Sequence, residues 1–319
     1  PVTRLAAVRA LAEWPDGGAF PALLAVAAGA GPENERLLAV RGAAGLLRAA
    51  DMPAASRIDS YGLALKAAKG PAEIKLLLAG LSEIKDPAAA DLVLPLLGRE
   101  DVGEEAGLAL AKMKGMTAAF DGKDLAGWKG LLAGPNDNPI KRAALNPEEL
   151  GKARAAADED MRAHWRAENG ELVFDGKGRS ICMARDYADF EMLADWLILP
   201  DGDSGIYLRG TPQVQIWDSA KHPEGSGGLY NNQKNPSKPL VCADNPVGKW
   251  NTFLIRMAGD RVTVHLNGKL VADNVALENY WARGQPIFTS GQIELQNHGN
   301  TLRFRNIFIR ETPRSAPKP

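Results

Sequence analysis

The composition of the chain changes near residue 117, and this change limits the possible folds more than any single motif does. Before it, Ala, Leu and Gly dominate and Trp14 is the only tryptophan, whereas all four histidines and the other tryptophans follow it. Alanine-rich, aromatic-poor sequence is typical of close-packed helices, and aromatic and β-branched residues interleaved with Gly and Pro are typical of sheets. The 319 residues suffice for about two domains. We therefore predict a helical domain at 1–116, a β domain at 117–312 and a disordered tail at 313–319.

Charge, cysteine content and hydropathy exclude several classes of protein. With 38 Lys and Arg against 39 Asp and Glu, the formal net charge is −1, so there is no electrostatic case for nucleic acid or an anionic membrane as the main partner. Two cysteines are too few for a disulfide-stapled scaffold or a Cys-rich zinc module. No apolar run approaches the roughly 20 residues that span a bilayer. The chain begins at Pro1 without a methionine, so we expect a fragment or a processed form, from which any signal peptide would have been lost.

Short apolar blocks at helical spacing fill the first domain, and Pro, Gly or Asp separates them. Residues 7–27 (AVRALAEWPDGGAFPALLAVA) and 76–98 (LLLAGLSEIKDPAAADLVLPLLG) share one plan: a helix, a short turn with Asp and Pro or Gly, and a second helix. This plan resembles HEAT-type repeats, in which stacked helix pairs bury a common core. An irregular helical bundle is the alternative. No residue set in this domain indicates chemistry, so its expected role is to dock a protein partner.

The second domain alternates apolar and polar residues with period two in many short segments, as strands do. Residues 262–266 form one such half-buried strand, and Asn267-Gly268 after it predicts a tight hairpin. Many short strands with little helix predict a β-sandwich. The exception is the charged, Ala-rich stretch 146–164, which we interpret as an inserted surface helix with Asn146 as its N-cap.

A series of sequence motifs from about Phe120 to Glu311 points to one family. In chain order they include FDGKDLAGWKG, DYADFEMLADWLI, DGDSGIYLRG, PQVQIWDS, GGLYNNQKNPSKP, GKWNTFLIRMAGDRVTVHLNGKLVAD and GQIELQNHGNTLRFRNIFIRE. This series resembles the 3-keto-disaccharide hydrolase domain. The resemblance implies a concanavalin A-like jelly roll, action on glycosides oxidised at C3 of the sugar, and an exported (periplasmic or extracellular) bacterial protein. The expected fold class is multidomain α + all-β, with HEAT-like helical repeats followed by this jelly roll.

Side-chain alternation sorts the polar residues of three predicted strands onto one outer face. They are Tyr207 and Arg209; Gln213, Gln215 and Trp217; and Gln292, Glu294 and Gln296, with His298 just past the last strand. Planar amides and a guanidinium bind paired sugar hydroxyls, and aromatic rings stack on a pyranose. We therefore predict substrate binding by Tyr207, Gln213, Gln215, Trp217 and Gln296; a merely solvated face is the alternative. Many members of the resembled family carry an acid where Gln213 stands, so no carboxylate role is transferred to it.

Cleavage of a 3-keto glycoside by elimination needs a base near C2, a donor or cation at the C3 oxygen, and an acid for the leaving oxygen. His298 is the first choice for the base because an imidazole titrates near working pH; a histidine that caps its turn is the alternative. Arg209 is the candidate cation, with a surface ion pair as the alternative. Glu294 or Asp218 is the candidate acid, and Asp218 could equally cap the turn at Ser219.

Two loops complete the predicted site. Residues 227–239 (GGLYNNQKNPSKP) are too rich in Gly, Asn and Pro for a strand, and Tyr230, Asn232 and Lys238 are candidates to close over the sugar. The segment 277–281 (LENYW) offers a second lip.

The sequence supports no metal site and no cofactor. The histidines are scattered without a His-x-His or HExxH spacing, while a calcium site made only of oxygen ligands would leave no trace in spacing. Whether Cys182 and Cys242 pair stays open. We predict a glycoside hydrolase or lyase acting on 3-keto sugars, with an oligosaccharide or glycoside as its substrate. The alternative is a non-catalytic carbohydrate-binding module joined to a helical docking domain.

Overall fold

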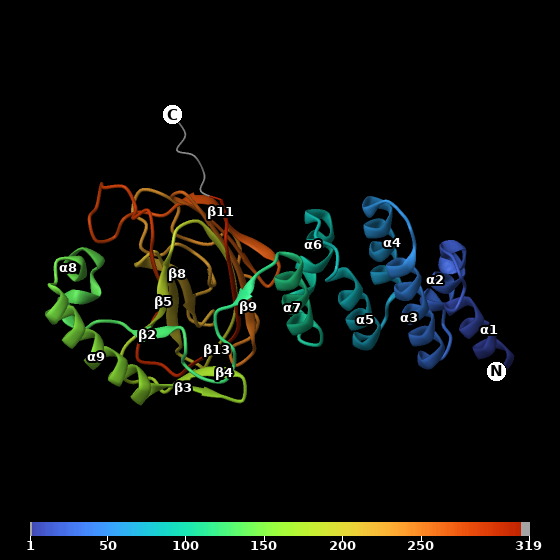
Figure 1. Ribbon diagram of the computed structural model, residues 1–319, viewed down its shortest axis with the longest axis horizontal. Coiled ribbons are helices and arrows are strands. Elements are labelled where there is room, and N and C mark those ends of the chain that lie inside the picture. The colour runs from blue at the N-terminus through green and yellow to red at the C-terminus, as the bar shows by residue number, and fades with distance from the viewer. Residues whose placement is uncertain (1, 314–319) are drawn as a thin grey trace. The chain divides into compact units, whose positions relative to one another are not determined.

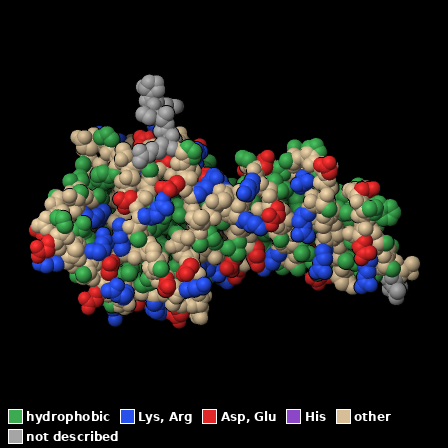
Figure 2. Space-filling model, in the orientation of Figure 1, with side chains coloured by type: hydrophobic (Ala, Val, Ile, Leu, Met, Phe, Trp, Pro, Cys, Tyr) green, Lys and Arg blue, Asp and Glu red, His purple; other side chains and the backbone are tan. Residues whose placement is uncertain are grey.

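A computed structural model describes residues 2–313 (Figure 1). Its contacts divide the chain between Gly115 and Met116 into two compact units, which we call the helical unit and the β unit. Of the tail predicted at 313–319, residues 314–319 lie outside the described residues. Figure 2 shows acidic and basic side chains interspersed on the visible face of both units, in keeping with the nearly balanced charge of the sequence.

Seven α-helices and two short 3-10 turns make up the described part of the helical unit. They are α1 (Val2–Ala12), η1 (Gly17–Ala19), α2 (Phe20–Ala28), α3 (Glu33–Ala49), α4 (Ala54–Ala67), α5 (Pro71–Leu81), α6 (Pro87–Val93), η2 (Leu94–Leu96) and α7 (Gly103–Met113). The predicted break at Asp86-Pro87 is confirmed: the Asp86 carboxylate accepts the Ala88 N–H at 2.9 Å and Pro87 opens α6. Leu23, Leu77 and Tyr61 are fully buried among these helices. The HEAT-like assignment of the pairs stays a prediction.

Within residues 2–313, no helix has the length and hydropathy that crossing a membrane would require.

The β unit consists of two antiparallel sheets, so the predicted fold class of helices followed by a β-sandwich is confirmed. The eight-stranded sheet runs β11-β10-β9-β6-β13-β4-β3, with β1 paired to β13. Its strands are β1 (Thr117–Ala118), β3 (Trp165–Glu168), β4 (Glu171–Phe174), β6 (Phe190–Ile198), β9 (Asn251–Ala258), β10 (Arg261–Leu266), β11 (Lys269–Ala276) and β13 (Leu302–Glu311). The five-stranded sheet runs β2-β5-β12-β7-β8. Its strands are β2 (Trp128–Gly130), β5 (Ile181–Tyr187), β7 (Asp203–Leu208), β8 (Thr211–Trp217) and β12 (Gly291–Leu295).

The predicted hairpin and the predicted inserted helix are both present. Asn267 and Gly268 join β10 to β11 with φ of +52° and +79°, the left-handed pair that a two-residue hairpin turn requires. The inserted helix is α9 (Pro147–His164), and the Asn146 side chain accepts the Glu149 N–H at 2.9 Å. A 3-10 turn, η3 (Gly134–Asp137), and a short helix, α8 (Pro139–Ala143), precede it. In Figure 1, α8 and α9 lie on the side of the β unit that carries β2 and β5.

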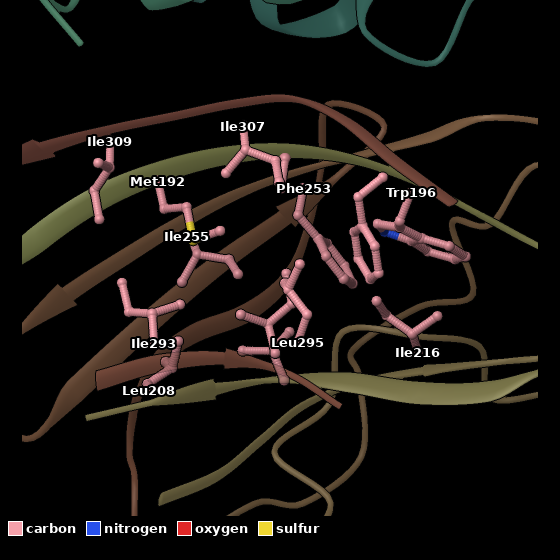
Figure 3. Packing of buried hydrophobic residues seen from close by; sticks show 14 of the residues in the cluster. Met192, Trp196, Leu208, Ile216, Phe253, Ile255, Ile293, Leu295, Ile307 and Ile309 are labelled. Atoms are coloured by element: carbon pink, nitrogen blue, oxygen red, sulfur yellow. The ribbon is translucent and has the colours of Figure 1, made fainter. Parts of the chain in front are cut away.

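The core of the β unit lies between the two sheets (Figure 3). Met192, Phe253 and Ile255 face it from the eight-stranded sheet, and Ile293 and Leu295 face it from β12. Each fully buried side chain of this kind stabilises the fold by roughly 1.5–3 kcal/mol. Because strand residues alternate faces, burying Ile293 and Leu295 in this core turns the side chains of their neighbours on β12 to the opposite side of the sheet.

Candidate functional site

The side of the five-stranded sheet that faces away from the core carries a row of polar side chains, which we call the polar face. Register pairs Lys129 with Cys182, Cys182 with Glu294, and Glu294 with Tyr207, so one row crosses four strands. Since neighbouring strands lie about 4.8 Å apart, the Cα atoms of this row span about 14 Å. The polar face comprises Lys129, Cys182, Tyr207, Gln213, Gln215, Gln292, Glu294 and Gln296. Three strands predicted to share an outer face thus do so.

Glu294 is the buried carboxyl group of the polar face, with 4% of its surface exposed. Its Oε2 lies 3.5 Å from Nε2 of Gln292 and 4.0 Å from Sγ of Cys182. Desolvation by burial raises the pKa of Glu294 to about 8, although the charge of Arg142 and the Gln292 hydrogen bond lower it. The side chain is therefore largely a neutral carboxylic acid at pH 7, able to donate a proton.

Asp218, the other candidate acid, is held as a turn cap. Its carboxylate accepts the N–H of Asp201 at 2.9 Å and that of Ala220 at 2.8 Å. The Asp201 hydrogen bond and then the Ala220 hydrogen bond lower the pKa of Asp218 despite its burial, so it stays ionised. Between the two acids left open by the sequence, the structure favours Glu294 and gives Asp218 the capping role.

Tyr207 lies beside Glu294 and contacts Gln296. Its hydroxyl accepts a hydrogen bond from Nε2 of Gln296 at 3.4 Å. Desolvation and the charge of Glu294 raise the pKa of Tyr207, so the phenol is neutral. The Oε1 atom of Gln296 is buried without a hydrogen-bond partner in the described part of the chain. A free acceptor next to a neutral hydroxyl is suited to a ligand that carries hydroxyl groups.

A chain of contacts links His298 to the glutamines of β8. Nδ1 of His298 lies 3.5 Å from Oδ2 of Asp203, and the His298 side chain is 58% exposed. Oδ1 of Asp203 accepts from Nε2 of Gln215, and Oε1 of Gln215 accepts from Nε2 of Gln213. A histidine whose Nδ1 faces a carboxylate keeps its Nε2 free for proton transfer. Asp203 thus links His298 to the polar face, and it was not among the residues predicted from the sequence.

Gln215 is buried and links strands β7 and β8, so it is not exposed to a ligand. Only 2% of its surface is exposed, and its Nε2 also donates to the Ser204 carbonyl at 2.9 Å. The expectation that the outer side of β8 is open was therefore wrong, because every residue of this strand is buried. Gln213 is buried as well, and its side chain lies across Gly205, where a Cβ would come within 2.9 Å of it.

Arg209 does not belong to the polar face, which corrects the sequence analysis. β7 ends at Leu208, and Arg209 begins the turn to β8 with φ +54°, so strand alternation does not apply to it. Its guanidinium is buried, donating to the carbonyls of Ala188 and Gly259 at 2.7 Å and forming an ion pair with Asp189. Both the predicted enolate contact and its alternative, a surface ion pair, give way to a buried ion pair.

Trp217 does not offer an open ring for stacking either. The His222 ring stacks on it at a centroid distance of 4.1 Å, and Tyr230 packs against it at 5.3 Å. Its Nε1 donates to the Gly225 carbonyl at 2.7 Å. The loop after β8 thus covers the indole, while Tyr230 itself remains 56% exposed.

Asn232 holds the loop 227–239 in place instead of pointing to a ligand. Its Nδ2 donates to the carbonyls of Pro236 and Ala276, and its Oδ1 accepts the Glu278 N–H at 3.0 Å. Lys238 stays exposed, 3.9 Å from Glu224. Of the three loop candidates, Tyr230 and Lys238 are accessible and Asn232 is structural.

Glu278 connects the two predicted loops, 227–239 and 277–281, through hydrogen bonds. Its carboxylate accepts the backbone N–H groups of Gln233, Lys234 and Asn235 at 2.7–3.0 Å. Desolvation raises the pKa of Glu278, but the Gln233, Asn235 and Lys234 N–H groups outweigh it and lower the pKa to about 2. The carboxylate therefore remains charged throughout the working pH range, and the two loops act as one rim.

Besides Asp203, three further groups on or near the polar face were not predicted from the sequence. Lys129 donates from Nζ to the Ala184 carbonyl at 3.1 Å, and desolvation, then the charge of Arg154, lowers its pKa. Cys182 accepts a hydrogen bond from Gln292 at 3.1 Å. Arg142 lies on α8. The alternation of Gly127 to Leu131 could have placed Lys129 on a strand face, but no local pattern marks Arg142.

Neither a metal cluster nor a disulfide is found among residues 2–313. No group of three or more His, Cys, Asp or Glu side chains there has the geometry to hold a metal ion. Cys182 is buried and Cys242 exposed, and both are free thiols, so they do not pair with each other.

Comparisons with known proteins show which family the sequence of the β unit matches. Residues 115–310 match the family described as the 3-keto-alpha-glucoside-1,2-lyase-like domain. A 3-keto-disaccharide hydrolase of Bacteroides thetaiotaomicron is 23% identical over 242 residues, which cover 61% of this chain and 78% of that protein. Two crystal structures of Parabacteroides distasonis proteins assigned as glycosyl hydrolases are also similar. The first is 26% identical with a TM-score of 0.46, covering 62% of this chain and 84% of that one. The second is 21% identical with a TM-score of 0.44, covering 62% and 94%. The family match spans more than half of this chain. The chain therefore belongs to the 3-keto-alpha-glucoside-1,2-lyase-like domain family, a carbohydrate-active family.

Proposed function

We propose that the β unit cleaves the glycosidic bond of glycosides whose sugar carries a ketone at C3. The observation that carries the proposal is Glu294, a buried carboxylic acid that is neutral at pH 7 and lies beside Tyr207 on the polar face. Elimination from such a sugar needs a proton for the leaving oxygen, and a carboxyl group with a pKa of about 8 supplies one at neutral pH. The family of the domain and the name of its Bacteroides relative support the same chemistry.

The reaction proceeds in two stages. The base takes the proton from C2, and the electron pair of that C–H bond forms the C2=C3 double bond of an enolate with its charge on the C3 oxygen. The enolate then collapses: the ketone re-forms, C1=C2 becomes a double bond, and the C1–O bond breaks with proton transfer from Glu294 to the leaving oxygen. In the second stage water adds to C1 and returns its proton to Glu294, while the base returns its proton to C2. The sum is hydrolysis; release of the enone before hydration would make the enzyme a lyase.

The residues of the site divide these tasks. His298, oriented by Asp203 at 3.5 Å, is the base. Glu294 is the acid. Tyr207 and Gln296 bind sugar hydroxyl groups, while Gln213 and Gln215 are buried and hydrogen-bonded to each other.

For the rest of the chain we propose a supporting role. The helical unit, with its HEAT-like pairs, docks a protein partner, and the protein acts after export from a bacterial cytoplasm. The docking role rests on the resemblance to HEAT-type repeats and on the lack of a residue set that indicates chemistry in the described part of the helical unit. The proposed export rests on the resemblance of the β unit to its family.

The direct test measures release of a chromogenic phenol from α- and β-3-keto-glucosides, beside the unoxidised glucosides, with and without EDTA. We expect release from a keto substrate alone, and loss of turnover in Glu294→Gln that is larger for a 3-keto disaccharide than for the phenol, because a phenolate leaves without protonation. Asp218→Asn is the matched control and should retain activity. No release from any keto substrate, with sugar binding seen by calorimetry, would instead favour a carbohydrate-binding module.

A further inference from the structure

The proposed reaction develops a negative charge on the C3 oxygen, and Arg209 is not available to stabilise it. Its guanidinium forms an ion pair with Asp189 and donates hydrogen bonds to backbone carbonyls. A cation that faces the polar face without a carboxylate partner would meet the requirement, because a group already neutralised by a fixed anion stabilises a new charge poorly.

Arg142 on α8 is such a cation. Its Nη1 donates to the backbone carbonyls of Asp137 at 3.1 Å and Asn136 at 3.4 Å. Among residues 2–313 no ion pair of Arg142 with a carboxylate within 4.0 Å is found, and the side chain is half-buried. Two backbone carbonyls therefore fix its position without a direct carboxylate partner, although the charge of the neighbouring Asp137 also acts on Glu294.

A glycine brings Arg142 to the edge of the polar face. A Cβ on Gly210 would lie 2.9 Å from Pro139 Cγ and 3.8 Å from Arg142 Nη2, so only glycine lets α8 settle on the turn between β7 and β8. The Gly210 N–H donates to the Gln292 carbonyl at 2.7 Å. Arg142 thus lies against a turn that is hydrogen-bonded to β12 two residues from Glu294.

The electrostatics of the polar face agree with this placement. After desolvation, the charge of Arg142 is the largest influence on the pKa of Glu294, which it lowers. The same charge lowers the pKa of Cys182 and of Lys129. The charge of Arg142 therefore acts on the row of residues that contains the proposed acid.

We propose that Arg142 binds the C3 oxygen of the keto sugar and stabilises the enolate that forms when the C2 proton is removed. The inference rests on the proposed function. In this step the C2–H bond breaks, its proton passes to the base, and its electron pair moves through C2=C3 onto the oxygen that the guanidinium holds. No covalent bond to Arg142 forms, and Glu294 acts only afterwards, on the leaving oxygen.

The experiment separates enolate formation from bond cleavage. The probe is a 3-keto derivative of 1,5-anhydroglucitol, which has no aglycone and so no exocyclic leaving group at C1, and proton NMR in D2O follows exchange of its C2 proton. The C4 proton, equally activated by the ketone, reports the uncatalysed rate in the same sample. We expect Arg142→Gln to lower both C2 exchange and cleavage of a 3-keto glucoside by roughly 100- to 1,000-fold. Glu294→Gln should lower cleavage alone.

Two further variants keep the inference falsifiable. Arg142→Lys retains the charge and should recover part of the exchange rate, and Lys141→Gln, an exposed neighbour on α8, should change neither rate. Wild-type activity with unchanged exchange in Arg142→Gln would overturn the role of Arg142 and leave the proposed function standing. A wild-type protein that neither exchanges the C2 proton nor cleaves any keto glycoside would overturn the proposed function, and this inference with it.

Discussion

The burial of Glu294 predicts a specific dependence of folding stability on pH. Its pKa is about 8 in the folded protein against an ordinary value of 4.5. Because the folded-state pKa is the higher one, the folded protein holds the proton more tightly than the unfolded chain does. The contribution is fully present below pH 4.5, is lost as pH rises, and levels off above about pH 8, where the folded protein ionises as well.

The magnitude follows from the difference in pKa. About 3.5 pKa units at about 1.4 kcal/mol per unit correspond to about 5 kcal/mol of unfolding free energy lost between pH 4.5 and pH 8. Glu294→Gln replaces the acid by a neutral amide of nearly the same shape and removes this loss. Other carboxylates titrate in both proteins, so the difference between wild type and variant isolates Glu294.

The assay is urea unfolding at pH 4.5, 6, 7 and 9, followed by tryptophan fluorescence. Adding Trp14→Phe to both proteins leaves every remaining tryptophan in the β unit, so the signal reports that unit alone. We expect the variant to gain on the wild type by several kcal/mol as pH rises across this window. Parallel stability curves at all four pH values would refute the argument that Glu294 folds as a neutral acid.

Three further predictions concern residues around the site. Arg209→Ala should destabilise the β unit by about 3–5 kcal/mol because the buried Asp189 loses the cation that it pairs with, and urea unfolding of the variant, compared with the exposed-site control Lys238→Ala, measures it; a loss below 1 kcal/mol would contradict the structural role. Glu278→Gln should free the loop 227–239, seen as faster proteolysis within it and a raised KM for keto glycosides with unchanged C2 exchange on the anhydroglucitol probe. His298→Ala should abolish C2 exchange, whereas Asp203→Asn should reduce it partially; exchange that survives in His298→Ala would show that another group is the base.

The fold and part of the site were readable from sequence because they depend on local alternation. Ile293 and Leu295 belong in a core, so Glu294 between them had to face away from it. The prediction that Arg209 lies on the outer face was wrong because β7 ends at Leu208, one residue earlier than the alternation assumed. Arg209 belongs to the turn, and its side chain takes a different direction. Arg142 could not be found, since its place depends on the missing Cβ of Gly210, which comes 68 positions later in the chain.

The position of β13 within its sheet sets the order in which the chain can complete its structure during synthesis. β13 ends at Glu311, yet it pairs with β6, with β4 and, at Thr117, with the first strand of the β unit. The contacts of the helical unit are all available once residue 115 has left the ribosome, whereas the larger sheet stays divided until the last strand emerges. A nascent chain stalled near residue 300 should therefore carry folded helices and an open, protease-sensitive half-sandwich whose unpaired strand edges are exposed to chaperones.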